Sequence, residues 1–266
     1  MIVQDLITVL DELAPFSLAA EWDNVGLMLG SPRQEMTGIL VGLDPTEELF
    51  DEAVELGLNT IVTHHPLIFQ GLKSIRTDQP AGRLIKKGML NDLAVIACHT
   101  NLDVVEDGVS DRLANLLGLK KLKPLSRLGA EETRGFGRLG VFDEPLDSEI
   151  FLARLRERIG ISVLPMAGKP PEKISKVAVC GGSGSDLSET AFLAGADLYI
   201  TAEIKHAVAR WAEANHFCIV DGSHFATENI VVPGLTARLK EIFADKKTAF
   251  RIKAASKQKN PLNFVY

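Results

Sequence analysis

Three times in the amino-terminal half of the chain, a short apolar stretch rich in β-branched residues is followed by a segment with helical character. The apolar stretches lie at residues 37–44, 60–63 and 93–98, and the helical segments begin at Pro45 and extend over 78–89 and 107–117. Strands that alternate with helices need crossover connections, which make neighbouring strands parallel and place helices on both faces of the sheet. The pattern predicts an α/β lobe, to which residues 2–14 add a further helix.

A second series of strands and helices follows a change in composition. Residues 120–135 combine several lysines with Pro124 and Gly129, which is typical of a linker. The strands expected beyond it cover 136–142, 161–167, 176–181, 197–202 and 217–221, and the helices cover 147–158, 186–194 and 204–214. A helix over 224–242, kinked or split by Pro233, and a strand over 248–255 are expected to complete the chain.

We therefore expect a protein of the α/β class with two lobes, each built on a mainly parallel or mixed sheet flanked by helices. The first lobe would comprise residues 1–125 together with 224–266, because the last helix and strand return to it, and the second would comprise residues 126–223. With 266 residues the chain is long enough to bury a core in each lobe.

Composition excludes some classes of function. Hydrophobic residues make up 46% and charged residues 24%, as in an ordinary globular protein, and the net charge of −6 argues against a nucleic-acid-binding protein with a basic surface. No stretch resembles a signal peptide or reaches membrane-spanning length. Cys98, Cys180 and Cys218 lie in apolar stretches, which is typical of buried thiols in a reducing compartment. We expect a cytoplasmic protein with neither a membrane nor a nucleic acid as partner.

Two adjacent histidines, His64 and His65, follow the predicted strand 60–63. Pro66 favours an extended conformation for His65, so the two rings can turn towards a shared target where the strand ends. The carboxyl ends of strands are also where an open α/β sheet binds its ligands. Taken alone, the pair fits equally well with polar residues at the start of a loop, so its interpretation depends on ligands at other strand ends.

A second polar group, residues 99–103, follows the predicted strand 93–98. Asp103 offers a carboxylate oxygen to set beside imidazole nitrogen, although an Asx turn or a helix cap is the simpler interpretation of an isolated aspartate. His99 is open to two interpretations, as a metal ligand or as a group that orients a ligand.

A third polar group follows the predicted strand 217–221, where Ser223 is expected to cap a helix. His224 and Glu228 are four residues apart, so in a helix they lie on the same face. Alone, this spacing also fits a solvated helix face with an incidental histidine.

Together the three groups indicate a dinuclear metal site. They supply three imidazole nitrogens and two carboxylates, from His64, His65, Asp103, His224 and Glu228. Five side chains without a thiolate exceed the ligand number of a tetrahedral structural zinc site, but they suit two divalent cations that share a carboxylate and keep positions open for water. Nitrogen and oxygen ligands accommodate zinc, manganese, iron, cobalt or nickel. The expected chemistry is hydrolytic.

Three further segments have two interpretations each. The polar loop before Gly26 is either functional or only a structural turn. The glycine loop at 181–184 either forms a turn or presents N–H groups to a phosphate, and Asp186 with Glu189 predicts a capping box at the next helix. Glu203 and His206 either begin a helix or take part in catalysis.

In this order, the motifs resemble the dinuclear-metal family named GTP cyclohydrolase 1 type 2 homologs, also called the NIF-three-like family. The resemblance covers nearly the whole chain through Trp22 to Leu27, His64 to Phe69, His99 to Asp103, Gly181 to Gly184, Glu203 to His206 and His224 to Glu228. The double histidine and the His-aromatic-x-Thr-Glu motif are specific in combination. The chain departs from the family pattern at Ala202, where glycine is usual, and at Ala207, where a second histidine is usual.

The resemblance implies a site for two divalent metals between two α/β lobes. By resemblance its ligands are His64, His65, Asp103, His224 and Glu228, with Glu228 bridging the metals. The resemblance also implies a ring-shaped homohexamer and places the chain with the shorter members of the family, which lack an inserted domain.

Three functional hypotheses follow. The first is a metal-dependent hydrolase that attacks a cyclic amidine C–N bond in a nucleotide or related heterocycle, with His206 or Glu203 as the proton donor. The alternative is a non-enzymatic scaffold or regulatory interaction protein, whose metals stabilise the oligomer. The third is a nucleotide-binding module built on the loop 181–184.

Overall fold

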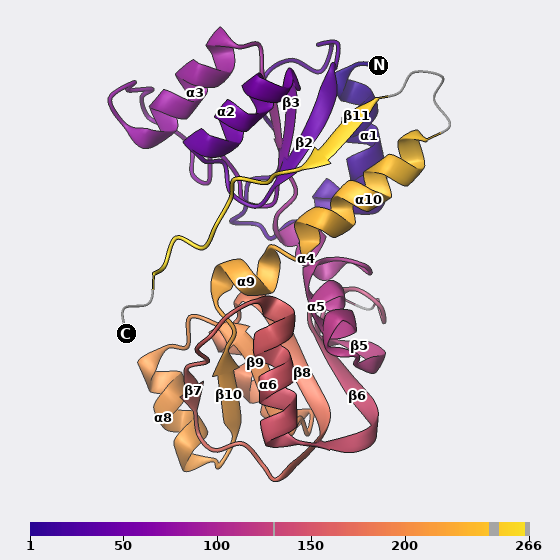
Figure 1. Cartoon of the computed structure of the whole chain (residues 1–266), viewed down its shortest axis with the longest axis vertical. Helices are drawn as coiled ribbons and strands as arrows, with labels where there is room; N and C mark the ends of the chain where they lie inside the picture. Colours follow the sequence, from indigo (N-terminus) through magenta and orange to yellow (C-terminus); the bar gives the residue numbers. More distant parts are fainter. Residues whose placement is uncertain (130, 245–249, 264–266) are drawn as a thin grey trace. The chain divides into compact units, whose positions relative to one another are not determined.

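The structure is a computed structural model that describes residues 1–129, 131–244 and 250–263 (Figure 1). The chain divides into two compact units. The first contains Met1–Leu102 and Val231–Lys259, and the second contains Asp103–Ile230 and Asn260–Tyr266. Each unit is built on one mixed sheet flanked by helices, which confirms the expected α/β class.

The first unit contains a five-stranded sheet in the order β1-β4-β3-β2-β11. Its strands are β1 (Gly26–Leu29), β2 (Gly38–Gly42), β3 (Thr60–Thr63), β4 (Ala94–Ala97) and β11 (Arg251–Ala254). Neighbours are parallel except β1, which runs antiparallel to β4. The predicted return of the chain's end to the first lobe is confirmed by β11, while residues 248–249 of the predicted strand lie outside the described residues.

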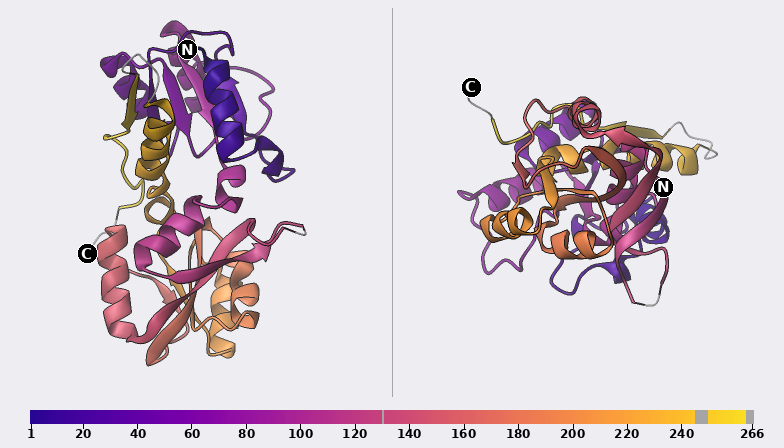
Figure 2. Two further views of the ribbon diagram at one scale, coloured as in Figure 1. Left: turned by 90° about the vertical axis from the view of Figure 1, so that its right-hand side faces the viewer. Right: turned by 90° about the horizontal axis from the view of Figure 1, so that it is seen from below.

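Helices cover both faces of this sheet (Figures 1 and 2). One face carries α2 (Glu47–Leu56) and α3 (Pro80–Leu90), and the other carries α1 (Val3–Leu13) and α10 (Val231–Phe243). On the face of α2 and α3, Leu40, Ile61 and Val95 of three adjacent strands pack against Phe50 and Ile85. Two short elements, a 3-10 turn at Phe16–Leu18 and the helix α4 at Thr100–Val104, complete this half of the chain.

The second unit contains a six-stranded sheet in the order β5-β6-β8-β9-β10-β7. Its strands are β5 (Lys120–Arg127), β6 (Gly135–Asp147), β7 (Met166–Ala167), β8 (Lys173–Ser183), β9 (Leu198–Ala202) and β10 (Cys218–Asp221). The strands β8, β9 and β10 are parallel, whereas β5, β6 and β7 each pair antiparallel with a neighbour.

Alternating side chains of the second sheet pack into two separate hydrophobic cores, one on each face. Val177 packs with Phe151 on the face covered by α5 (Val109–Leu117) and α6 (Ser148–Ile159). The next residue, Ala178, packs with Ala212 on the opposite face, which is covered by α7 (Ser188–Leu193) and α8 (His206–Ala214). Figure 2 shows the sheet between α6 and α8. This two-residue period is that of a strand buried on both sides.

The predicted linker over 120–135 is wrong. Residues Lys120–Arg127 form the edge strand β5, which pairs antiparallel with β6. Exposed lysines and Pro124 are tolerated there because an edge strand leaves one side of its backbone unpaired. The division of the chain also differs from the one expected. Residues from Asp103 onward belong to the second unit, and so do residues 224–230.

Two other elements differ from the sequence-based expectation. The strand expected over 161–167 is limited to Met166–Ala167. The helix expected over 224–242 is split in two, as one of the two alternatives predicted, but the break between α9 (His224–Glu228) and α10 lies before Pro233 and not at it. Pro233 lies in the first turn of α10, where its missing N–H removes no intrahelical hydrogen bond.

A buried ion pair joins β6 to α5 in the second unit. The Arg138 side chain is only 2% exposed, and its Nε and Nη2 donate to the two carboxylate oxygens of Asp111 at 2.6 and 3.1 Å. Its Nη1 donates to the backbone carbonyls of Gly135 and Gly137. The guanidinium is thus satisfied without water, as a buried charge requires.

The segment after β11 is fastened to the first unit. The buried carboxylate of Glu52 accepts the backbone N–H of Ser256 at 2.9 Å. The side chain of Gln258 accepts the N–H of Leu43 at 2.6 Å and donates to the carbonyl of Asp44 at 2.5 Å. This segment therefore holds the loop that follows β2.

Two expectations from composition also have structural counterparts. Cys98, Cys180 and Cys218 are all buried free thiols, as predicted. Within the described ranges, none of the helices combines the length and the apolar character needed to cross a bilayer.

Candidate metal centre

The two adjacent histidines extend the pairing of β3 with β2 by two residues. The N–H of His64 donates to the carbonyl of Gly42 at 3.2 Å, and that of His65 donates to the carbonyl of Leu43 at 2.9 Å. Their ring centroids are 5.0 Å apart at an interplanar angle of 44°. One nitrogen each of His64, His65 and His99 lie within 4.8 Å of one another, a group that could hold a metal ion. His99 thus joins the pair, as the alternation of strand and helix suggested.

Each ring in this group contacts an oxygen atom through Nδ1. The partner of His64 is the carbonyl of Cys98 at 2.9 Å, and the partner of His65 is the Asp44 carboxylate at 2.7 Å. Because these oxygens only accept hydrogen bonds, each neutral ring carries its proton on Nδ1 and keeps the lone pair on Nε2. Metal-binding histidines in proteins show this arrangement.

His99 is held in the same way by Asp23, from the polar loop before Gly26. The Asp23 side chain is 0% exposed and accepts from His99 Nδ1 at 2.8 Å and from the N–H and Oγ1 of Thr100. Burial raises the pKa of Asp23, but the hydrogen bonds from His99 and Thr100 outweigh it and lower the pKa overall. Burial and the neighbouring His64 lower the pKa of His99 despite Asp23, so the ring is neutral at pH 7.

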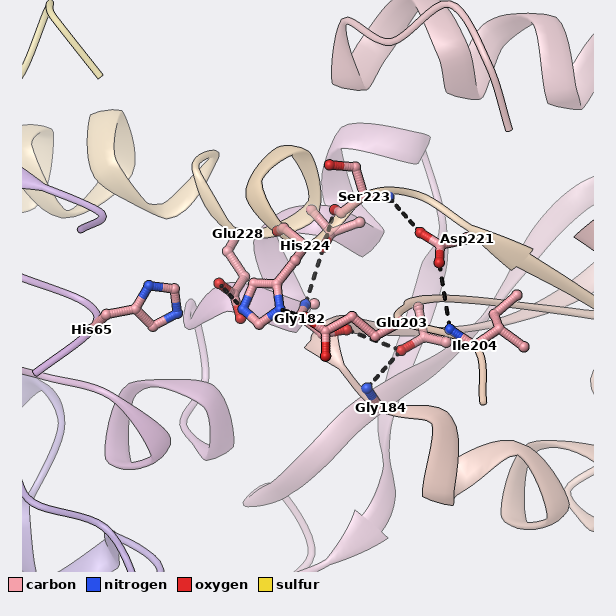
Figure 3. Close-up of polar contacts among 12 residues, drawn as sticks. His65, Gly182, Gly184, Glu203, Ile204, Asp221, Ser223, His224 and Glu228 are labelled. Atoms are coloured by element: carbon pink, nitrogen blue, oxygen red, sulfur yellow. Dashed lines mark hydrogen bonds and ion pairs between the residues drawn. The ribbon is translucent and has the colours of Figure 1, made fainter. Parts of the chain in front are cut away.

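In the second unit, α9 presents His224 and Glu228 side by side (Figure 3). The Nε2 of His224 lies 3.0 Å from Oε2 of Glu228, which confirms that the two share a helix face. On the other side of the ring, Nδ1 of His224 contacts Oε1 of Glu203 at 2.9 Å. His224 thus repeats the pattern of the first unit, with a carboxylate behind the imidazole.

Gly182 lets the backbone of β8 approach these two donors. Its φ is +65°, and a Cβ atom built there would lie 2.0 Å from Oε1 of Glu228 and 3.3 Å from Nε2 of His224. Only glycine fits both the conformation and the space.

The N–H groups of the glycine loop are used within the protein. Gly182 donates to Oγ1 of Thr227 at 3.0 Å, and Gly184 donates to Oγ1 of Thr201 at 2.9 Å. These contacts favour the structural turn over the phosphate cradle. The predicted capping box is wrong, because α7 has no side-chain cap and the Asp186 carboxylate pairs with Lys205 at 2.7 Å.

Asp103 lies in α4, and its charge acts on a thiol of β8. Burial raises the pKa of Cys180 to about 12, and the charges of Asp103 and Glu228 add to this increase. Both carboxylates of the predicted ligand set therefore lie near the same thiol in the second unit.

Two further residues singled out in the sequence, His206 and Ser223, make other contacts. His206 begins α8 and lines a cavity of about 680 Å³, together with residues such as Lys169, Arg210 and His216. Ser223 precedes α9 but gives no side-chain cap, and its Oγ instead accepts from the amide of Asn260 at 3.0 Å.

The orienting carboxylates Asp23, Asp44 and Glu203 are the part of the site that sequence reasoning missed or placed in another role. Asp44 ends the predicted strand 37–44, and its position at a strand end was the available signal. For Asp23 the signal was its place in a polar loop ahead of a glycine.

The chemistry of the donor set fits divalent cations. Four imidazoles with Nδ1 engaged by oxygen, together with nearby carboxylates, are the mixed nitrogen and oxygen ligands that such ions prefer. Fold and site together define an α/β protein with a histidine cluster in the first unit that could bind metal, and with a histidine and glutamate pair in the second unit.

Comparison with known proteins gives the family. The chain belongs to the Duf34/NIF3 (NGG1p interacting factor 3) family, whose model matches residues 1–261, so the resemblance inferred from the motifs is confirmed. A GTP cyclohydrolase 1 type 2 homolog of Streptomyces coelicolor is 38% identical over 231 residues, covering 85% of this chain and 81% of that protein. The homolog of the same name from Clostridium perfringens is 34% identical over 266 residues and 100% of both chains. The crystal structure of Staphylococcus aureus protein SA1388 is similar with a TM-score of 0.92 at 31% identity, covering 100% of this chain and 99% of that one.

Proposed function

We propose that the chain binds two divalent cations and hydrolyses a cyclic C–N bond in a nucleotide or related heterocycle. The proposed ligands are His64, His65, Asp103, His224 and Glu228. The observation that carries the proposal is the shared orientation of the histidines, in which Nδ1 of His64, His65 and His224 is engaged by an oxygen atom. A solvated, incidental histidine has no need of such a partner.

The residues of the chain supply binding and orientation. Asp44 and Glu203 hold the rings of His65 and His224 and make their Nε2 atoms more basic, which strengthens a bond to a cation. Divalent cations at such a site supply Lewis-acid chemistry and make water acidic enough to act as a nucleophile near neutral pH.

Of the two residues proposed for catalysis, the geometry favours a positioning role for Glu203, because its Oε1 is engaged by His224. His206 is kept as the proposed proton donor. The variant H206Q tests this role, with loss of turnover and unchanged metal content as the expected result. Equal turnover in H206Q and the parent chain would remove His206 from the mechanism.

The names of the relatives support the choice of the first substrate. Both relatives described above carry the name GTP cyclohydrolase 1 type 2 homolog, so GTP is the first nucleotide to test. Hydrolytic opening of the imidazole ring of guanine leaves a formamide, and hydrolysis of that formamide by a second water releases formate, which can be measured directly.

The test combines metal analysis with turnover. The parent chain, H65A and the control H216A are purified, exposed to Zn²⁺ or Mn²⁺, freed of loose metal and measured by elemental analysis. We expect two cations per parent chain, fewer in H65A and two in H216A, because His216 is an exposed residue outside the ligand set. Formate release from GTP and from other nucleotides is then compared with a chelated sample. A parent chain that takes up no cations, or an H65A chain that takes up as many, would contradict the proposed site.

A further inference from the structure

Two large aromatic side chains of the first unit are exposed side by side. Trp22 is 61% exposed and Phe69 is 47% exposed. Their ring centroids lie 5.8 Å apart at an interplanar angle of 50°, so the rings form a shallow corner. Exposing so much aromatic surface is unfavourable, and such surfaces on folded proteins commonly mark binding sites. We call this pair the aromatic corner.

Hydrogen bonds hold the two loops that carry the aromatic corner. Nδ2 of Asn24, two residues after Trp22, donates to the carbonyl of Ile68 at 2.6 Å, next to Phe69. Between Trp22 and Asn24, the buried Asp23 binds His99 and Thr100. The corner is therefore preorganised, so a ligand that stacks on it does not have to order these loops first.

The aromatic corner borders the nitrogen donors of the same unit. The ring centroid of His99 lies 6.1 Å from those of both Trp22 and Phe69, at interplanar angles of 75° and 69°. The ring centroid of His99 also lies 5.2 Å from that of His64 and 5.5 Å from that of His65. A flat molecule lying on the corner consequently presents its edge to the imidazoles.

We infer that the aromatic corner is the stacking site for the base of the substrate, an aromatic nitrogen heterocycle of purine size. The inference rests on the proposed function and names how that site takes its substrate. A purine matches both halves of the surface, because one face of the base stacks on the aromatic corner while its polar edge reaches the imidazoles. An alkyl chain would use the apolar faces and leave the polar border without a partner. The inference also gives a role to the loop before Gly26, for which the sequence left two interpretations open.

Fluorescence offers a direct test, because the chain has two tryptophans, Trp22 and Trp211. In the variant W211F, Trp22 is the sole indole, and guanosine is titrated into the protein as purified and after chelation. We expect saturable quenching by guanosine and none by ribose. Adding F69A should weaken guanosine binding by about fivefold or more, the equivalent of one stacking contact. F69Y should restore it.

The variant L90A in the W211F background is the matched control, because Leu90 is an exposed apolar residue of the same unit, at the end of α3. Its affinity for guanosine should equal that of W211F. Unchanged affinity in F69A, or the absence of quenching, would overturn the inference. A changed sedimentation coefficient for F69A without any quenching would identify the corner as a contact between copies of the chain and would also overturn it.

The outcomes separate this inference from the proposed hydrolysis. Quenching that depends on Phe69 in a protein without turnover would support the stacking site and count against the hydrolase. Metal uptake without any guanosine binding would support the metal centre and remove the stacking site.

Discussion

Each histidine ring of the candidate metal centre is oriented by a contact between its Nδ1 and an oxygen atom of the same unit. For His64 the oxygen is a backbone carbonyl, and for His65, His99 and His224 it is a carboxylate. A carboxylate stabilises positive charge on the ring, so it makes Nε2 a stronger donor to a cation than a carbonyl does. The carboxylates are therefore expected to tune affinity without touching the cation.

Removing one of these carboxylates should weaken metal binding. In E203A the His224 ring loses the partner of Nδ1, so we expect the affinity for Zn²⁺, measured by competition with a chelating dye, to fall by about 10- to 100-fold. D186A is the matched control, because it removes a carboxylate of the same unit that pairs with Lys205 and not with a histidine of the candidate metal centre. Equal affinities in E203A and D186A would show that Glu203 does not position the ring.

A single methyl group at Gly182 should disturb the donors more than the fold. In G182A the new Cβ would meet Glu228 and His224, so we expect Zn²⁺ binding to be lost. G160A has a similar backbone conformation, with φ of +71°, but no atom within 4 Å of the new Cβ. It should cost about 1–2 kcal/mol of stability, measured by urea denaturation, and leave Zn²⁺ binding intact. Zn²⁺ binding by G182A at the parent affinity would contradict the close approach.

The sequence predicted the candidate metal ligands more readily than the carboxylates that orient them. His224 and Glu228 are related by helical spacing, and their contact follows from one short element. Asp23 and His99 are 76 residues apart, and their hydrogen bond depends on how loops of the first unit fold together. A partner fixed by tertiary structure leaves no local pattern in the sequence.

At the level of helices and strands, buried strands could be predicted from local sequence, whereas an edge strand could not. The strands β2, β3 and β4 are buried throughout, and their continuous apolar runs predicted them correctly. The edge strand β5 has exposed lysines and a proline, so its composition is that of a linker. Its pairing with β6 is set by tertiary contacts.

The ion pair between β6 and α5 gives a prediction for stability. R138M leaves the Asp111 carboxylate buried without its charged partner. We therefore expect the free energy of unfolding, measured in urea, to fall by about 3–5 kcal/mol. K205A breaks an exposed ion pair of the same unit, and its effect should stay within about 0.5 kcal/mol. A loss in R138M no larger than in K205A would mean that the buried pair contributes little.

On the scale of the whole molecule, bound cations should stabilise the chain, because the unfolded chain lacks an assembled site. At a free cation concentration of one hundred times Kd, cation binding adds about 2.7 kcal/mol to the free energy of unfolding. Chelation should therefore lower Tm by roughly 5–10 °C, measured by differential scanning calorimetry. In H65A the chelator should have little effect. A fall in sedimentation coefficient on chelation would favour the scaffold hypothesis over the hydrolase.

The alternation of strand and helix predicted two α/β units, but not where one gives way to the other. The division falls at Leu102 and Asp103, within the helix α4, where no glycine or proline marks it. Such a boundary follows from which sheet each segment joins, and sheet membership depends on pairing between distant strands.

The pairing of β11 with β2 has a consequence for how the protein is made. Residues 103–230 leave the ribosome as one continuous stretch, whereas the first unit needs β11, residues Arg251–Ala254, to complete its sheet. Although the first unit starts earlier in translation, its sheet is completed after the sheet of the second unit. Until then, the nascent polypeptide carries β2 as an open template for intermolecular strand addition, a hazard that a chaperone bound to the emerging chain would offset.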